Sequence, residues 1–234
     1  MTQFIREKTV CAICGHENTV HCLTSFSRFG SCALDTRPPE LFSFTLFLQD
    51  CSHCGYVNTF LNEGDKDTIY LLQSDKYKTC NGINPKSFQA KQFIQYALIQ
   101  ARKKHLNLPY EEDDNPADNE FWGYLNAAWA CDDSRYKEDA VKCRRKCLEL
   151  INPLILSKQE TEEQEVLFGI KADLLRRTRQ FDALLVEYHN KSFENPYVDQ
   201  VVRFEIDLAK ANDAKNHLMS DIDQTKYPLK TTTK

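Results

Sequence analysis

Residues 11–16 of this chain read Cys-Ala-Ile-Cys-Gly-His, and residues 51–56 read Cys-Ser-His-Cys-Gly-Tyr. The same knuckle therefore occurs twice: two cysteines two residues apart, with glycine directly after the second. This gap lets a tight turn aim two thiolates at one metal ion, and glycine adopts the backbone conformation that other residues avoid. Two knuckles supply the four ligands of a tetrahedral site, so we predict one bound metal ion. The predicted ligands are Cys11, Cys14, Cys51 and Cys54.

The ligand set favours zinc, because structural zinc sites are closed shells of four cysteine or histidine ligands. An iron site of the rubredoxin type uses the same thiolate geometry and would carry electrons, so iron is the alternative. A thioredoxin-like disulfide would need its cysteine pair near a βαβ pattern, which is missing here, and would not explain the repeated motif. The sequence thus predicts one Zn²⁺ per chain.

The composition is that of an ordinary soluble globular protein. Of 234 residues, 41% are hydrophobic and 27% are charged, and the longest apolar run, residues 41–48, is too short to cross a bilayer. Residues 1–14 lack the apolar stretch of a signal peptide, because residues 6–8 are all charged. A net charge of −4 argues against a dedicated duplex-binding protein, whose surface is usually basic. We therefore expect a cytoplasmic protein with no membrane partner.

The residues around the two knuckles favour short β-strands. Apolar, β-favouring pieces lie at residues 19–23, 41–48 and 56–61. This arrangement predicts a zinc ribbon with a long insertion, occupying residues 1–80. Hairpins of this size are marginally stable in water, so the metal should supply much of the folding free energy of the ribbon.

From Asn84 onward the hydrophobic period changes from two to near four, which predicts helices. The expected helices cover residues 85–106, 118–130, 136–151, 161–178, 181–192 and 198–219. Pro153 and Pro196 are expected to end two of them. The predicted fold class is α+β and mostly α: a zinc ribbon at 1–80, a helical domain at 81–220 and a flexible tail at 221–234.

The helices show a weak internal repeat of 43 residues. Placing Asp139 on Asp182 also superposes Pro153 on Pro196. Helices paired through short turns, with a small residue where they cross, are typical of tetratricopeptide-like arrays, which present a concave binding face. We therefore predict a tetratricopeptide-like body that binds a protein partner.

The loop between the knuckles is a candidate binding element. It carries Arg28, Asp35 and Arg37 beside a stiff pair of prolines. An arginine fork held beside a carboxylate by rigid backbone either recognises a carboxylate or phosphate, or ties the insertion to the ribbon. Of these two interpretations, we favour the structural tie.

Two short basic runs, at residues 144–146 and 176–179, lie on successive predicted hairpins. Arg176 and Arg177 are the candidate binding residues of the second run. Such runs form either a solvated helix face or a groove for an acidic peptide or nucleic acid. We favour the solvated face and keep the groove as the alternative.

Motifs of the common catalytic sites are missing from the sequence. It has no phosphate-binding loop, no dinucleotide-binding glycine pattern, no His-Glu-x-x-His zinc motif and no Gly-x-Ser-x-Gly nucleophile motif. We therefore favour a binding protein over an enzyme and name no catalytic residue.

The order of these features resembles a bacterial family, the domain of unknown function numbered 2225. The likeness rests on the two knuckles, on Leu-Asp-Thr-Arg-Pro-Pro at 34–39 between them, and on Leu-Leu-Arg-Arg at 174–177 before Phe-Asp-Ala at 181–183. It covers nearly the whole chain. The resemblance implies a zinc site at the knuckles and tetratricopeptide-like helices after it, and it implies no established activity. Ala12 and Ser52 stand where the family usually has proline, which makes the chain divergent.

The leading functional hypothesis is a zinc-binding scaffold or adaptor that binds a protein through its helical face. A nucleic-acid-binding protein that uses the ribbon and the basic runs is the first alternative, because affinity for phosphates needs clustered cations. A thiolate-metal redox or electron-transfer protein is the second alternative, because iron fits the same four cysteines.

Overall fold

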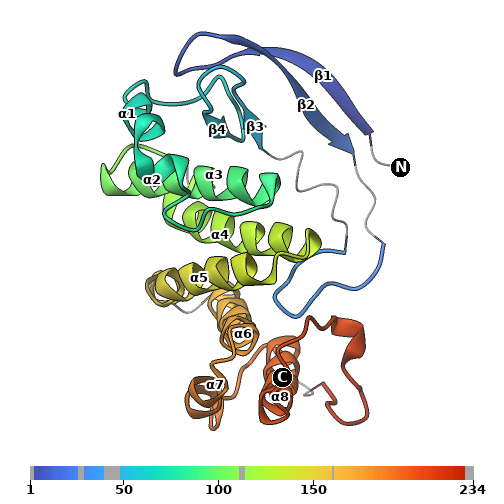
Figure 1. Cartoon of the computed structure of the whole chain (residues 1–234). Helices are drawn as coiled ribbons and strands as arrows, with labels where there is room; N and C mark the ends of the chain where they lie inside the picture. Colours follow the sequence, from blue (N-terminus) through green and yellow to red (C-terminus); the bar gives the residue numbers. More distant parts are fainter. Residues whose placement is uncertain (1–2, 26–28, 40–47, 111–113, 160, 230–234) are drawn as a thin grey trace. The chain divides into compact units, whose positions relative to one another are not determined.

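The computed structural model describes residues 3–25, 29–39, 48–110, 114–159 and 161–229 (Figure 1). Its fold is α+β and mostly α, as predicted. The chain forms two compact units. Unit 1 comprises Met1–Arg28 and Glu40–Cys143, and unit 2 comprises Phe29–Pro39 and Arg144–Lys234. The division differs from the predicted boundaries at residues 80 and 220, because the first two long helices group with the knuckles and a loop from between the knuckles groups with the last helices.

Unit 1 begins with a long antiparallel hairpin of β1 (Gln3–Val10) and β2 (Glu17–Ser25). The predicted piece at residues 19–23 lies within β2. The first strand was not predicted, because its side chains are exposed on both faces and show no apolar alternation. A second short hairpin pairs β3 (Gln49–Asp50) with β4 (Val57–Asn58). Most of the predicted piece at residues 41–48 lies outside the described residues.

Four helices complete the described part of unit 1 up to residue 133. They are α1 (Thr68–Gln73), α2 (Asp75–Lys78), α3 (Phe88–His105) and α4 (Pro116–Asp133). The first two short helices were not predicted. The long helices α3 and α4 pack against each other at Gly123, where a Cβ atom would lie 2.8 Å from the Cβ atom of Ala97. Glycine at this position therefore allows the close approach of the two helices.

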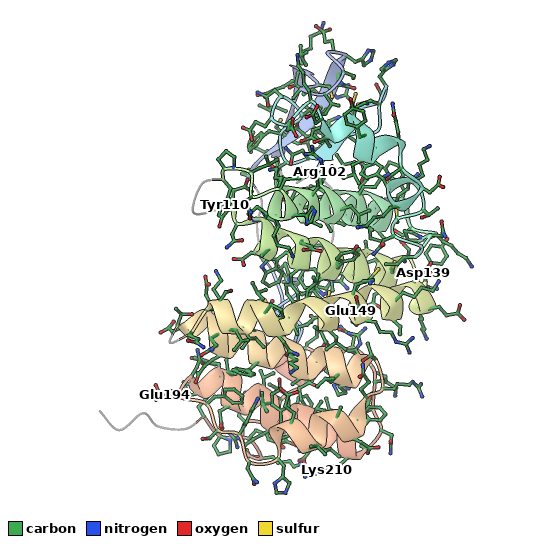
Figure 2. All side chains as sticks on the ribbon, turned by 90° about the vertical axis from the view of Figure 1, so that its left-hand side faces the viewer. Arg102, Tyr110, Asp139, Glu149, Glu194 and Lys210 are labelled. Carbon is green, nitrogen blue, oxygen red and sulfur yellow. The ribbon has the colours of Figure 1, made fainter. Side chains whose placement is uncertain are left out.

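Helix α5 (Lys137–Ser157) crosses the division between the units. Asp139 and Glu149, both on this helix, are labelled in Figure 2. The sequence predicted an end at residue 151, before Pro153, but the helix continues for six more residues. Two features explain why the helix continues. Pro153 is exposed, so water can donate a hydrogen bond to the backbone carbonyl that has lost its N–H donor. Leu154 and Ile155, which follow it, are buried and stabilise the last turns.

Unit 2 contains α6 (Glu162–Arg177), α7 (Phe181–Tyr188) and α8 (Pro196–Lys210). Their shared core includes Leu175, Leu184, Tyr188, Phe193 and Val202. Pro196 is the first residue of α8, where its missing N–H costs nothing, and the Asn195 side chain caps this end. The helix predicted at residues 198–219 ends early, because Asn212 adopts a positive φ of 55° shortly after Lys210.

A segment from between the knuckles, Phe29–Pro39, belongs to unit 2, and we call it the strap. The blue strap and the red C-terminal segment lie side by side in Figure 1, joined by a β-bridge between Ala33 and Leu218. Leu34 is buried with Val201, Ile222 and Tyr227. Two residues of the segment predicted as a flexible tail, Ile222 and Tyr227, thus lie in an apolar core.

The predicted 43-residue repeat agrees with the structure at its aspartates but not at its prolines. Asp139 and Asp182 both lie in the first turn of a helix, α5 and α7 respectively. However, Pro153 lies inside α5, whereas Pro196 begins α8. The tetratricopeptide-like array thus stays a prediction. In the described part of the chain, no helix is long and apolar enough to cross a membrane.

Candidate metal centre

The four predicted cysteine ligands come together in unit 1. One sulfur atom from each of Cys11, Cys14, Cys51 and Cys54 lies within 4.8 Å of the other three. The sulfur atoms of Cys11 and Cys54 are 3.7 Å apart, and those of Cys14 and Cys51 are 3.6 Å apart. A tetrahedral ion with metal–sulfur bonds of about 2.3 Å requires sulfur–sulfur edges of about 3.8 Å. The donor set and its spacing therefore fit one tetrahedral metal ion.

The two knuckles have the same backbone geometry. The N–H of Gly15 donates to the carbonyl of Cys11 at 2.9 Å, and the N–H of Gly55 donates to the carbonyl of Cys51 at the same distance. Both glycines have a φ of +73°, and a Cβ atom on either would meet nothing within 4 Å. The positive φ, and not lack of space, therefore explains glycine after each second cysteine.

Asn18 joins the two knuckles, although no sequence pattern marks it as part of the site. Its Oδ1 accepts hydrogen bonds from the N–H of Ser52 at 3.0 Å and from the hydroxyl of Ser52 at 2.9 Å. Its Nδ2 donates to the carbonyl of His16 at 3.0 Å and lies 3.5 Å from the sulfur of Cys51. The buried asparagine thus fixes one knuckle relative to the other.

The local environment favours ionisation of one sulfur and opposes that of another. Burial alone would raise the pKa of Cys51, but hydrogen bonds from the N–H groups of Cys54 and His53 and from Asn18 lower it to about 7. Burial and the neighbouring thiols raise the pKa of Cys54 above its ordinary value. Four sulfur atoms this close cannot all ionise by themselves, so a central cation is needed to stabilise four thiolates.

The histidines near the knuckles are not part of the cysteine cluster. The rings of His16 and His53 stack on each other with centroids 5.2 Å apart. His21 accepts a hydrogen bond from Arg6 at 3.1 Å. Among the described residues, the four cysteines are the only group of metal-binding side chains. Outside the cluster, Cys80, Cys131, Cys143 and Cys147 are buried, as expected for core cysteines.

A tyrosine from a following helix supports the second knuckle. The hydroxyl of Tyr77, on α2, donates to the carbonyl of Gly55 at 2.7 Å. Tyr77 is buried, and burial raises the pKa of its hydroxyl above the ordinary value, so it remains a donor at neutral pH. The sequence offered no signal for this contact, because the two residues are 22 positions apart.

Two candidate residues of the loop, Asp35 and Arg37, lie in the strap, whereas Arg28 lies outside the described residues. Asp35 is only 1% exposed, and its carboxylate lies 3.9 Å from the guanidinium of Arg144 in the same unit. Its other oxygen accepts a hydrogen bond from the N–H of Arg37 at 3.3 Å. Asp35 thus ties the loop to helix α5, whereas the sequence analysis expected a tie to the ribbon.

Arg176 of the second basic run is fully buried. Its guanidinium pairs with Asp173 at 2.8 Å and with Glu205, and it donates to the carbonyls of Asp213 and Lys215. Arg177 donates to Asn216 at 2.7 Å. Arg144 of the first run is buried as well. Each run therefore buries its first arginine inside unit 2, which corrects the expected solvated face for these two residues and places them where a groove ligand would not reach them.

No family model matches the chain, and no curated protein or solved structure matches it. The resemblance to the family of unknown function numbered 2225 therefore stays a prediction from the motifs.

Proposed function

We propose that this protein is a zinc-stabilised adaptor of the bacterial cytoplasm that binds a protein partner through the helices of unit 2. The observation that carries the proposal is the set of four sulfur atoms spaced for one tetrahedral ion. Cysteine fills every ligand position, so no position is open for water or substrate, and such closed sites are structural. The metal then stabilises the fold and takes no part in chemistry.

The exposed apolar residues of unit 2 support its role as the binding part. Val186 on α7 is 83% exposed, and Leu156 on α5 is 64% exposed. Large apolar side chains at an interface contribute most of the binding free energy when a partner buries them. Burial of Arg144 and Arg176 removes one cation from each basic run, and fewer accessible cations make nucleic acid the less favoured partner.

Native mass spectrometry of the protein from its own host, at natural abundance, tests the proposal. We expect one zinc ion per chain and a co-purifying protein whose binding changes little with salt. A coloured iron protein whose absorbance bleaches on reduction would replace the adaptor with an electron-transfer protein. Affinity for nucleic acid that falls steeply with salt would replace it with the nucleic-acid alternative.

A pair of matched variants tests the surface. Val186→Asp places a charge on α7 and should release the partner, while the zinc content stays unchanged. Tyr70→Asp is the control, because Tyr70 lies on α1 of unit 1 and is 72% exposed. Equal retention of the partner by both variants would refute binding through this part of unit 2.

A further inference from the structure

Unit 1 contains a cleft of about 600 Å³ beside the second knuckle. One wall is formed by β4 and the turn after it, and the other by the C-terminal end of α3 and the residues that follow. A cleft of this volume matches the size of small-molecule sites. It belongs neither to the metal centre nor to the helices of unit 2, so it goes beyond the adaptor function.

The two cations of the cleft are already paired. The guanidinium of Arg102 lies 2.7 Å from the carboxylate of Asp65, and the ammonium of Lys103 lies 3.5 Å from that of Asp114. The N–H of Asp67 and the guanidinium of Arg102 lower the pKa of Asp65, so this carboxylate stays charged at neutral pH. An anionic ligand would have to break these pairs.

Glu63 is the third carboxylate of the cleft, and its charge is not balanced. Within the described part of the chain, its carboxylate has no ion-pair partner, and its side chain is exposed. The lining residues therefore carry one net negative charge, from three carboxylates against two cations.

Two exposed aromatic rings line the same cleft from opposite walls. Phe60 follows β4 and is 56% exposed, and Tyr110 follows α3 and is 54% exposed. Arg102 and Tyr110 are labelled in Figure 2. Aromatic faces attract organic cations and cover their apolar stems. The combination of two rings with an unpaired carboxylate matches such a ligand.

The turn that carries Phe60 and Glu63 is rigidly held before any ligand binds. The buried Asn58 donates to the carbonyl of Phe60 at 3.1 Å and to the carbonyl of Glu63 at 3.2 Å. The hydroxyl of Tyr56 also donates to the carbonyl of Glu63, at 2.8 Å. Leu61, between them, is buried, and its carbonyl accepts a hydrogen bond from Ala12 of the first knuckle. Preorganisation of this kind lowers the cost of binding.

We propose that this cleft binds an organic cation, an ammonium or guanidinium group on an apolar stem. The rings of Phe60 and Tyr110 cover the stem, and the Glu63 carboxylate receives the charged end. A free amine and the side chain of a basic residue in a peptide share this chemistry, and the experiment separates these two sources.

A titration followed by amide NMR on the full-length, metal-loaded protein tests the proposal. The free probes are butylammonium and butylguanidinium, and the peptide probe is acetyl-Gly-Arg-Gly-amide, with acetyl-Gly-Gln-Gly-amide as its neutral match. We expect the cations to shift the amide resonances of Phe60, Glu63 and Tyr110. Binding of the free cations alone identifies a small-amine site, and stronger binding of the arginine peptide identifies a peptide site.

Variants and an anion provide the decisive controls. Glu63→Gln should weaken cation binding about tenfold, the effect of losing one charge-assisted hydrogen bond. Glu138→Gln removes an exposed carboxylate of the same unit outside the cleft and should leave binding unchanged. Equal effects of both variants, no shifts with any cation, or preferential binding of butyrate or inorganic phosphate would each overturn the proposal.

Discussion

Asn18 and Ser52 form two hydrogen bonds to each other, from the N–H and the hydroxyl of Ser52 to the amide oxygen of Asn18. These bonds connect the strand after the first knuckle to the turn of the second knuckle. The two residues are 34 positions apart, so the contact exists only when both knuckles have folded. Asn18 therefore positions one pair of cysteine ligands relative to the other.

Replacing Asn18 with alanine should weaken metal binding. Partners of this kind, outside the ligand set, typically contribute about 10- to 100-fold to metal affinity, and we expect Asn18→Ala to lose affinity within this range. Competition with a chromophoric chelator measures the change. Ser52→Ala is the matched control. We expect a smaller loss of metal affinity, because this variant keeps the N–H that donates a hydrogen bond to Asn18. Unchanged affinity of Asn18→Ala would show that the knuckles need no link.

Replacing one ligand should release the metal while much of the helical signal remains. Cys51→Ser breaks the four-sulfur shell, and we expect the ribbon to unfold while the helices of unit 2 persist. Elemental analysis and far-ultraviolet circular dichroism measure the two effects. Cys32→Ser is the control, because Cys32 is exposed, lies in the strap and is outside the cluster. Total loss of helical ellipticity in Cys51→Ser would mean that the chain folds only as a whole.

Truncating the buried leucine of the strap should destabilise unit 2 without affecting the metal. Leu34→Ala leaves a cavity next to Val201, Ile222 and Tyr227, and substitutions of this type cost about 2–5 kcal/mol. Urea unfolding followed by circular dichroism measures the free energy of unfolding. Leu156→Ala, at an exposed leucine of the same unit, should change it by less than about 0.5 kcal/mol. Loss of the bound metal from Leu34→Ala would instead link the strap to the knuckles.

The buried cluster around Arg176 should make unit 2 less stable at high pH. Burial and the nearby Asp173 carboxylate raise the pKa of Glu205 to about 8, although the Arg176 guanidinium opposes them. The folded state therefore keeps a proton that the unfolded state loses near its ordinary pKa of about 4.3, so this stabilisation is lost as the pH rises through about 8.

The measurement compares urea midpoints of the wild type and Glu205→Gln at pH 6 and pH 9. We expect the midpoint of the wild type to fall more than that of Glu205→Gln, whose amide does not titrate. Parallel midpoints at both pH values would show that Glu205 is charged throughout this range. Arg176→Met tests the same cluster through its stability. Removing one partner of a buried ion pair should lower the free energy of unfolding by about 3–5 kcal/mol.

The parts of the fold that local chemistry determines could be predicted from the sequence. Cys11 and Cys51 each begin a knuckle whose spacing and glycine define the turn, and the sulfur cluster confirms this pattern. The starts of the long helices follow from the hydrophobic period, as in the helix predicted from residue 161 and observed from Glu162, but Pro196 begins α8 where it was expected to end a helix. The predicted end of a helix before Pro153 was wrong, because a proline is tolerated inside a helix when it lies on a solvent-exposed face.

The parts that depend on contacts far apart in the sequence could not be predicted. Nothing near Asn18 indicates that it contacts the other knuckle, and nothing near Asp35 indicates that it pairs with Arg144. Likewise, Phe60 and Tyr110 share a cleft only because β4 and α3 lie next to each other. A periodic pattern reports which face of an element is buried, but it does not report which neighbour buries it.

The strap also constrains the order in which the protein can fold during synthesis. The N–H of Ser220 donates to the hydroxyl of Ser31, a hydrogen bond between residues 189 positions apart. The strap leaves the ribosome long before the C-terminal segment exists, so this contact forms only after the second knuckle and every long helix have been translated. The core of unit 2 can therefore be completed only when translation is nearly finished. A gene fragment that encodes the late helices alone would produce a core with one side missing.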